Sequence, residues 1–267
     1  MTRPAEHPAP ARRIDPRPHD SESFIGTPYY DEALDVPQSE AHMAMVIELG
    51  SVLRGLAGEL GYTFHSDNPI WYLHIEDDEQ RVGYPDLALM TPGTAVERST
   101  AEEARWVAEV VSTTDRRKEL KDTRFQLALN EYNGVPEFAL LFPELDDPRA
   151  LRFHRLEDGR YQELDVGPGA SVRSEAVPGL ELRVLPRAEW REGRKVEVLY
   201  EGVRRPPLDE ALEQAEAARA RARAAEAKAE EERARAEEER ARADSAEART
   251  EALLAQLRAL GVDPEGE

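Results

Sequence analysis

Apolar residues recur at two spacings in the first part of the chain, and each spacing predicts a different element. Over residues 38–61 they return every three or four positions, which predicts a helix with Ser39 as its N-terminal cap. Two shorter apolar runs, at 70–75 and 81–90, are joined by a polar turn and predict an antiparallel hairpin. In this interpretation Asp86 lies inside the second strand of the hairpin.

A strand, a helix and a second strand follow in succession. The run Trp106–Ser112 is apolar, residues 112–115 match a capping box, and the charged helix that follows ends at Gly134. The chain then returns as a strand at 137–142. A strand–helix–strand unit of this kind predicts a right-handed crossover between parallel strands. The core domain is therefore expected within residues 38–148.

Short alternating strands separated by glycine-containing turns occupy residues 149–205. They are predicted at four places: 151–155, 161–166, 180–185 and 196–200. The pattern favours a small β extension packed on the core, and no catalytic motif is visible in it.

Beyond two adjacent prolines the composition changes abruptly. Residues 208–260 contain no glycine or proline, and Ala and Leu fall at heptad a and d positions. This predicts a helix that forms a weak, parallel coiled coil and hence a homo-oligomer. Pairs such as Glu231 and Arg235, four residues apart, would also support a lone charged helix. The helical appendage is assigned to 206–261 and a short tail to 262–267.

Composition narrows the classes of function. The 267 residues include no cysteine, so disulfides, thiolate zinc sites and cysteine nucleophiles are excluded. No apolar run is long enough to span a membrane and no signal peptide is visible, so we expect a soluble, cytoplasmic protein without a membrane partner. The formal net charge of -20 counts against a nucleic-acid role. Residues 1–37, rich in proline and charge, are expected to form a disordered arm.

Two acidic residues lie within apolar strands, Asp86 in Gly83–Met90 and Glu109 in Trp106–Ser112. Burying a carboxylate costs several kcal/mol unless it is paired or binds a metal, and two neighbouring carboxylates also repel each other. A divalent cation between them would remove both problems. The alternative is that each carboxylate is satisfied by an arginine or by backbone amides. His42, on the first helix, is interpreted as solvated or locally paired.

Four motifs occur in order along the core. They are Gly83-Tyr-Pro-Asp86, Glu109-Val-Val-Ser112, the charged helix after it, and Gly134-Val-Pro-Glu-Phe-Ala-Leu-Leu141. Together they resemble the Uma-two family of restriction endonucleases, within the PD-(D/E)xK nuclease superfamily, over roughly residues 36–200. The resemblance implies a restriction-endonuclease-like α/β core, with a mixed sheet flanked by helices, that acts on DNA.

The resemblance also implies a metal site. Asp86 and Glu109 would ligate Mg²⁺ or Mn²⁺, assisted by the backbone carbonyl of Val110. The superfamily places a lysine two residues after the second acidic ligand, where this chain has Val111.

In the Uma-two family the basic residue instead comes from the following helix, four residues after an aspartate. The corresponding pair here is Asp122 and Gln126, and Gln126 carries no charge. Lys118, Lys121 or Arg124 could substitute for it.

Two functions follow from these residues. The first is metal-dependent hydrolysis of DNA by an endonuclease, which the presence of Asp86 and Glu109 favours. The second is a catalytically weak or inactive nuclease fold that acts as a coiled-coil interaction module. The uncharged positions Val111 and Gln126 and the acidic net charge favour the second.

Overall fold

The structure is a computed structural model that describes residues 13–14, 39–111 and 116–259. The chain divides into two compact units, Met1–Leu208 and Asp209–Glu267. The first unit contains two large sheets, a hairpin and their helices, and the second consists of the long helix that begins at Leu208. The division lies close to the change of composition at the two prolines.

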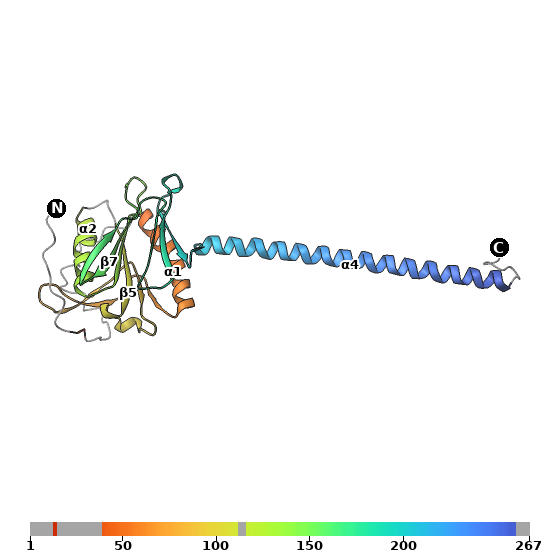
Figure 1. The fold of residues 1–267 in the computed structure, drawn as a ribbon, viewed down its shortest axis with the longest axis horizontal. Coiled ribbons are helices and arrows are strands. Elements are labelled where there is room, and N and C mark those ends of the chain that lie inside the picture. Colours follow the sequence, from red (N-terminus) through yellow and green to blue (C-terminus); the bar gives the residue numbers. More distant parts are fainter. Residues whose placement is uncertain (1–12, 15–38, 112–115, 260–267) are drawn as a thin grey trace. The chain divides into compact units, whose positions relative to one another are not determined.

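A six-stranded mixed sheet forms the centre of the first unit (Figure 1). Its strands, in spatial order, are β1 (Thr63–His65), β4 (Leu87–Met90), β5 (Ala104–Val110), β6 (Glu137–Leu141), β7 (Leu151–Glu157) and β8 (Arg160–Leu164). Strands β5 and β6 run parallel, and every other neighbouring pair in this sheet is antiparallel. The predicted parallel pairing across the strand–helix–strand unit is therefore confirmed.

Apolar layers cover both faces of this sheet. One layer contains α1 (Glu40–Leu60) and a second sheet, whose strands are β9 (Ser171–Arg173), β10 (Leu180–Val184), β11 (Val196–Tyr200) and β12 (Val203–Arg205). The other contains the hairpin β2 (Ile70–Leu73) and β3 (Gln80–Gly83) and the helical segment after β5. Figure 1 shows α1 and α2 on opposite sides of β5 and β7.

The alternation along β5 decides which face Glu109 takes. Trp106, Ala108 and Val110 point into the layer that contains α1, whereas Val107 belongs to the opposite layer. Because successive side chains of a strand point to opposite faces, Glu109 lies on the side of the hairpin and the helical segment.

Helix α1 forms as its sequence predicts. Ser39 Oγ accepts a hydrogen bond from the His42 N–H at 3.1 Å, and Gly61 ends the helix with a left-handed φ of 80°. The buried side chains on its inner face include Met45 and Leu49. The described residues of the unit also contain the 3-10 turns η2 (Val96–Arg98), η3 (Ala101–Glu103) and η5 (Arg187–Glu189).

The helical segment between β5 and β6 is not a uniform α-helix. It consists of α2 (Arg116–Leu120), the π-helical turn η4 (Lys121–Gln126) and α3 (Leu127–Tyr132). Gly134 follows with a left-handed φ of 74°, as expected for a residue that ends a helix. The predicted capping box at 112–115 lies outside the described residues.

The predicted strand at 81–90 is wrong, because the structure has two strands there in different sheets. Strand β3 ends at Gly83 and β4 begins at Leu87. Pro85, between them, has no N–H to donate, and its carbonyl accepts the Asp67 N–H at 3.1 Å instead. Asp86 therefore precedes a strand of the main sheet and does not lie within the hairpin.

The expected β extension at 149–205 is divided between two sheets. Strands β7 and β8 extend the main sheet from β6, so the core continues past residue 148, and β9–β12 form the separate sheet. At the other end of the chain Ile14 is 7% exposed, and its N–H donates to Glu102 Oε1 at 3.3 Å. Apart from residues 13–14, the segment 1–37, for which disorder is expected, lies outside the described residues.

Helix α4 (Leu208–Ala259) contains no buried residue. The predicted pairs Glu231–Arg235 and Glu238–Arg242 are present, each with an N–O distance of 2.5 Å. No helix among the described residues is long and apolar enough to cross a membrane.

Candidate functional site

Asp86 and Glu109 meet where β4 begins and β5 ends. Leu87 pairs with Ala108 in the antiparallel ladder, so Asp86 stands across from Glu109. Asp86 Oδ2 accepts the Val110 N–H at 2.7 Å. The backbone N–H of Asp86 also acts on the Glu109 carboxylate, where it opposes the rise in pKa. Glu109 is 5% exposed.

The π-helical turn brings a third carboxylate and an ammonium group to the pair. Asp122 is buried, and its Oδ1 lies 4.0 Å from Lys121 Nζ. The charges of both residues act on Glu109. The site therefore combines Asp86, Glu109 and Asp122 with one lysine from the following helix.

Burial and mutual repulsion control the protonation of these carboxyl groups. Burial, then the charges of Asp86 and Asp122, raises the pKa of Glu109 well above its ordinary value. Burial also raises the pKa of Asp122, to about 7, although Lys121 opposes the shift. Burial disfavours the charged form of Lys121, but Glu109 and the neighbouring aspartates outweigh it and raise the pKa of Lys121. Glu109 and Asp122 therefore hold protons more tightly than isolated carboxyl groups do.

His42 belongs to the same cluster, which corrects the expectation that it is solvated. Its side chain reaches from the first turn of α1, and Nε2 lies 3.5 Å from Asp86 Oδ1. Burial acts to lower the pKa of His42, but the contact with Asp86 outweighs burial and the pKa is raised. The sequence contained a signal for this placement, because His42, Met45 and Leu49 recur at helical spacing along the buried face of α1.

Asp67 is a further acidic neighbour. Burial and the charge of Asp86 raise its pKa, whereas Lys121 acts in the opposite direction. Its backbone has a left-handed φ of 52°, a conformation that Asp tolerates better than most residues. The bond from its N–H to the Pro85 carbonyl places it beside the chain that enters Asp86.

The uncharged positions singled out in the sequence are both buried. Gln126 is 6% exposed, like Asp122 one helical turn earlier, and its backbone carbonyl accepts Asn130 Nδ2 at 2.8 Å. Val111 lies in the apolar core, where its N–H donates to the Leu141 carbonyl at 2.7 Å. Among the three basic residues considered as substitutes, Lys121 has a charge that acts on both Glu109 and Asp122.

The donor set suits a hydrated divalent ion. Asp86 and Glu109 supply two carboxylates, and Mg²⁺ commonly takes one or two such groups and completes its octahedral shell with water. Within the described ranges no three His, Cys, Asp or Glu side chains are arranged to enclose a metal ion. The residues therefore fit an open Mg²⁺ or Mn²⁺ site and do not fit a closed protein cage.

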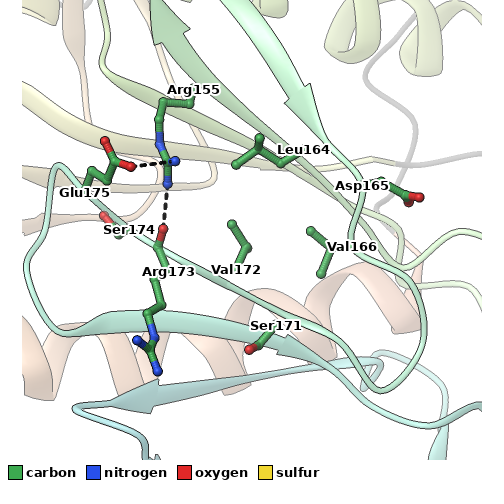
Figure 2. Close-up of a pocket in the computed structure, with 9 residues that line it drawn as sticks. All are labelled: Arg155, Leu164, Asp165, Val166, Ser171, Val172, Arg173, Ser174 and Glu175. Carbon is green, nitrogen blue, oxygen red and sulfur yellow. Dashed lines mark hydrogen bonds and ion pairs between the residues drawn. The ribbon is translucent and has the colours of Figure 1, made fainter.

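A cavity of about 560 Å³ lies among other residues (Figure 2). It is lined by Arg155, Leu164, Asp165, Val166, Ser171, Val172, Arg173, Ser174 and Glu175. The Arg155 guanidinium pairs with Glu175 at 2.8 Å and donates to the Arg173 carbonyl at 2.7 Å, as the dashed lines in Figure 2 show. Asp86, Glu109 and Asp122 do not line this cavity.

A six-stranded mixed sheet with helices, and an acidic pair where β4 begins and β5 ends, define the class of this protein as α/β. The chain belongs to the Uma2 family, described as "Putative restriction endonuclease", whose profile matches residues 28–185. This is the family that the sequence motifs resemble.

Other comparisons add little. The chain is similar to a crystal structure of "a putative nuclease belonging to DUF820" from Anabaena variabilis ATCC 29413, with 16% identity and a TM-score of 0.37. The similarity covers 52% of this chain and 73% of that one. No match was found among curated proteins.

Proposed function

We propose that this protein is a metal-dependent endonuclease that hydrolyses phosphodiester bonds in DNA. One observation carries the proposal: Asp86 stands across from Glu109 in the β4–β5 ladder, and neither forms an ion pair with an arginine in the described part of the chain. A buried carboxylate that serves only the fold would be neutralised by its surroundings. Membership of a restriction-endonuclease family supports the same conclusion.

Asp86 and Glu109, with the Val110 carbonyl, would hold the metal. When bound, a divalent ion polarises a phosphoryl oxygen and lowers the pKa of a coordinated water. Asp86 presents an oxygen ligand that needs little reorganisation, because its carboxylate is already fixed by the Val110 N–H.

Lys121 is the residue we propose to stabilise negative charge on the reacting phosphate. It is the lysine that the charges of Glu109, Asp122 and Asp86 act on, and Asp122 stands 4.0 Å from its ammonium group. An ammonium group can stabilise a phosphate oxygen electrostatically, whereas the Gln126 amide can only donate a hydrogen bond. Lys121 would thus replace the lysine that the superfamily carries at the position of Val111.

The proposal is tested by cleavage of supercoiled plasmid in the presence of Mg²⁺ or Mn²⁺. The parent should nick and linearise the plasmid, and chelation of the metal should stop the reaction. Lys121→Gln should lower the rate about 10²–10³-fold, the usual cost of losing one electrostatic donor. Lys228→Gln, on the exposed helix α4, is the matched control and should cleave like the parent. No metal-dependent cleavage by the parent would contradict the proposal.

The Gln126→Lys variant tests whether residue 126 faces the metal site. If Gln126 faces the metal site, a lysine there should raise cleavage, and the gain should disappear in the double variant with Glu109→Gln. An unchanged rate would assign Gln126 to packing of the helix. A gain that survives the loss of Glu109 would show that the cleavage arises elsewhere.

The second candidate function, an interaction module without turnover, rests on α4. This helix buries none of its residues, and heptad positions at its C-terminal end carry Leu253 and Leu257. We propose weak parallel self-association through this seam. Analytical ultracentrifugation at high concentration should give the full chain a mass above its 30.0 kDa monomer, whereas a chain ending at Arg205 should have its monomer mass. A full chain that stays at its monomer mass would contradict the association.

A further inference from the structure

We propose that His42 is a positioning residue that holds Asp86 in the orientation needed for metal binding. The inference rests on the proposed function, because it assigns Asp86 a ligand role. His42 lies on α1, which contributes none of the three carboxylates Asp86, Glu109 and Asp122.

The surroundings of the imidazole carry this inference. His42 is 5% exposed, and neither ring nitrogen makes a hydrogen bond with the described residues. Nε2 faces Asp86 Oδ1 at 3.5 Å. A buried polar ring without hydrogen bonds reduces stability, so its retention needs another explanation. The Asp86 carboxylate is the group toward which it is directed.

Asp86 is held at one oxygen by the backbone and faces His42 with the other. Oδ2 accepts the Val110 N–H, which fixes that oxygen against the end of β5. Rotation of the carboxylate about its own axis would bring Oδ1 away from the imidazole. A shift of a few tenths of an ångström converts the 3.5 Å contact into a hydrogen bond and fixes the second oxygen as well.

The position of His42 is itself fixed by the N-terminus of α1. Ser39 Oγ accepts the His42 backbone N–H at 3.1 Å and contacts Glu144 Oε1 at 3.1 Å. The charges of Glu144 and Asp122 also act on the imidazole. The charges of three carboxylates thus act on the ring. Asp86 contacts it directly, with Oδ1 3.5 Å from Nε2.

Groups that orient a metal-binding carboxylate affect metal affinity without touching the metal. Loss of such an outer partner commonly weakens binding by about 10–100-fold. His42→Leu should therefore weaken Mn²⁺ binding by this factor. His42→Gln should retain most of the affinity, because the Gln side-chain amide can present an N–H near the position of Nε2.

Isothermal titration calorimetry with Mn²⁺ tests the inference on the full chain. The variants are His42→Leu, His42→Gln and Asp86→Asn, with His65→Leu as the matched control. His65 is a buried histidine that bonds to Ser99 at 3.1 Å instead of to a carboxylate, so its loss should lower stability and leave Mn²⁺ affinity unchanged. Affinity in His42→Leu equal to that of the parent, or an equal loss in His65→Leu, would overturn the inference.

A second measurement does not depend on the metal. In a double-mutant cycle with His42→Leu and Asp86→Asn, the shifts of the urea midpoint without metal should be non-additive, because the two side chains interact. Additive shifts overturn the inference even if the parent binds Mn²⁺. Absence of Mn²⁺ binding by the parent overturns the proposed function, and the cycle then decides alone whether His42 positions Asp86.

Discussion

Two buried glutamates on adjacent parallel strands have opposite surroundings. Glu137, at the start of β6, accepts hydrogen bonds from Ser174 Oγ and from the Glu175 N–H at 2.7 Å, and lies 3.4 Å from Arg155 Nε. Glu109, near the end of β5, faces two aspartates and shares one lysine with them. Both are almost inaccessible, with exposures of 1% and 5%.

The difference shows that burial alone does not identify a functional carboxylate. Both oxygens of Glu137 accept hydrogen bonds, from Ser174 and Glu175 in the loop after β9. The Glu137 carboxylate therefore holds this loop against β6. Glu109 has neighbours of its own sign, so its burial lowers stability unless a cation is bound. The predictions below separate these two roles.

Glu137→Ala should have the largest effect, on stability. The substitution removes the acceptor of the Ser174 hydroxyl and of the Glu175 N–H, although Arg155 keeps Glu175 and the Arg173 carbonyl as partners. Removing one partner of a buried ion pair typically costs about 3–5 kcal/mol. Urea denaturation should show the loss as a lower midpoint. Glu163→Ala, which removes an exposed partner of Arg152, is the control and should cost less than about 1 kcal/mol. Equal midpoints for the two variants would remove the distinction.

Glu109→Gln should have the reverse profile. Plasmid cleavage should fall about 10²–10³-fold. The midpoint of unfolding in the absence of metal should stay unchanged or rise, because the substitution removes repulsion with Asp86 and Asp122. Cleavage and urea denaturation on the same preparation provide both readouts. A variant that unfolds while the parent binds no metal would show that Glu109 is structural, like Glu137.

The acidic cluster should also make stability depend on pH. Because the pKa of Asp122 is raised from 3.8 to about 7, the folded state keeps a proton that the unfolded state has released within this interval. The free energy of unfolding should therefore fall as pH rises from about 4 to 7.

Asp122→Asn should flatten this dependence and be more stable than the parent at pH 8. The free energy of unfolding should rise by on the order of 1–2 kcal/mol. This is less than the full pKa shift of Asp122 would give, because its side chain remains 12% exposed and can relax. Thermal unfolding in a chelator over this pH range measures it, with Asp244→Asn on α4 as control. Parallel curves for Asp122→Asn and the parent would exclude this origin of the dependence.

Removal of α4 should have the smallest effect on stability, because its ion pairs, such as Glu231–Arg235, are exposed. Ending the chain at Arg205 should change the stability of the first unit by less than about 0.5 kcal/mol. Trp71, Trp106 and Trp190 all lie in that unit, so tryptophan fluorescence during urea denaturation reports on it alone. A large drop in the midpoint would show that α4 supports the fold.

Elements with a strong period could be predicted from the sequence. Helix α1, strand β5 and the parallel crossover to β6 follow from local spacing and turn signals. The assignment of β7 and β8 to the main sheet could not be predicted, because which strand edge pairs with which is decided by contacts distant in the chain. The break at Pro85 was visible as a proline within a predicted strand, and such a residue argues against a continuous central strand.

The site was predictable in part. Glu109 and Asp86 stand together because β4 and β5 pair in the register that their apolar runs require. The sequence could not show which of Lys118, Lys121 and Arg124 lies nearest the acidic pair, because the π-helical turn changes the direction of each side chain and has no signature in the sequence. His42 was misassigned because its partner lies 44 positions away in the chain.

The π-helical turn also bears on how this site could change during evolution. A π turn accommodates one residue more than the α-helical turn it replaces, so deletion of a single residue within Lys121–Gln126 would restore an α-helix. Every side chain on the N-terminal side of the deletion would then rotate together relative to α3. A new residue could thus be presented to Glu109 by one change in length, without any substitution at the position that finally faces it.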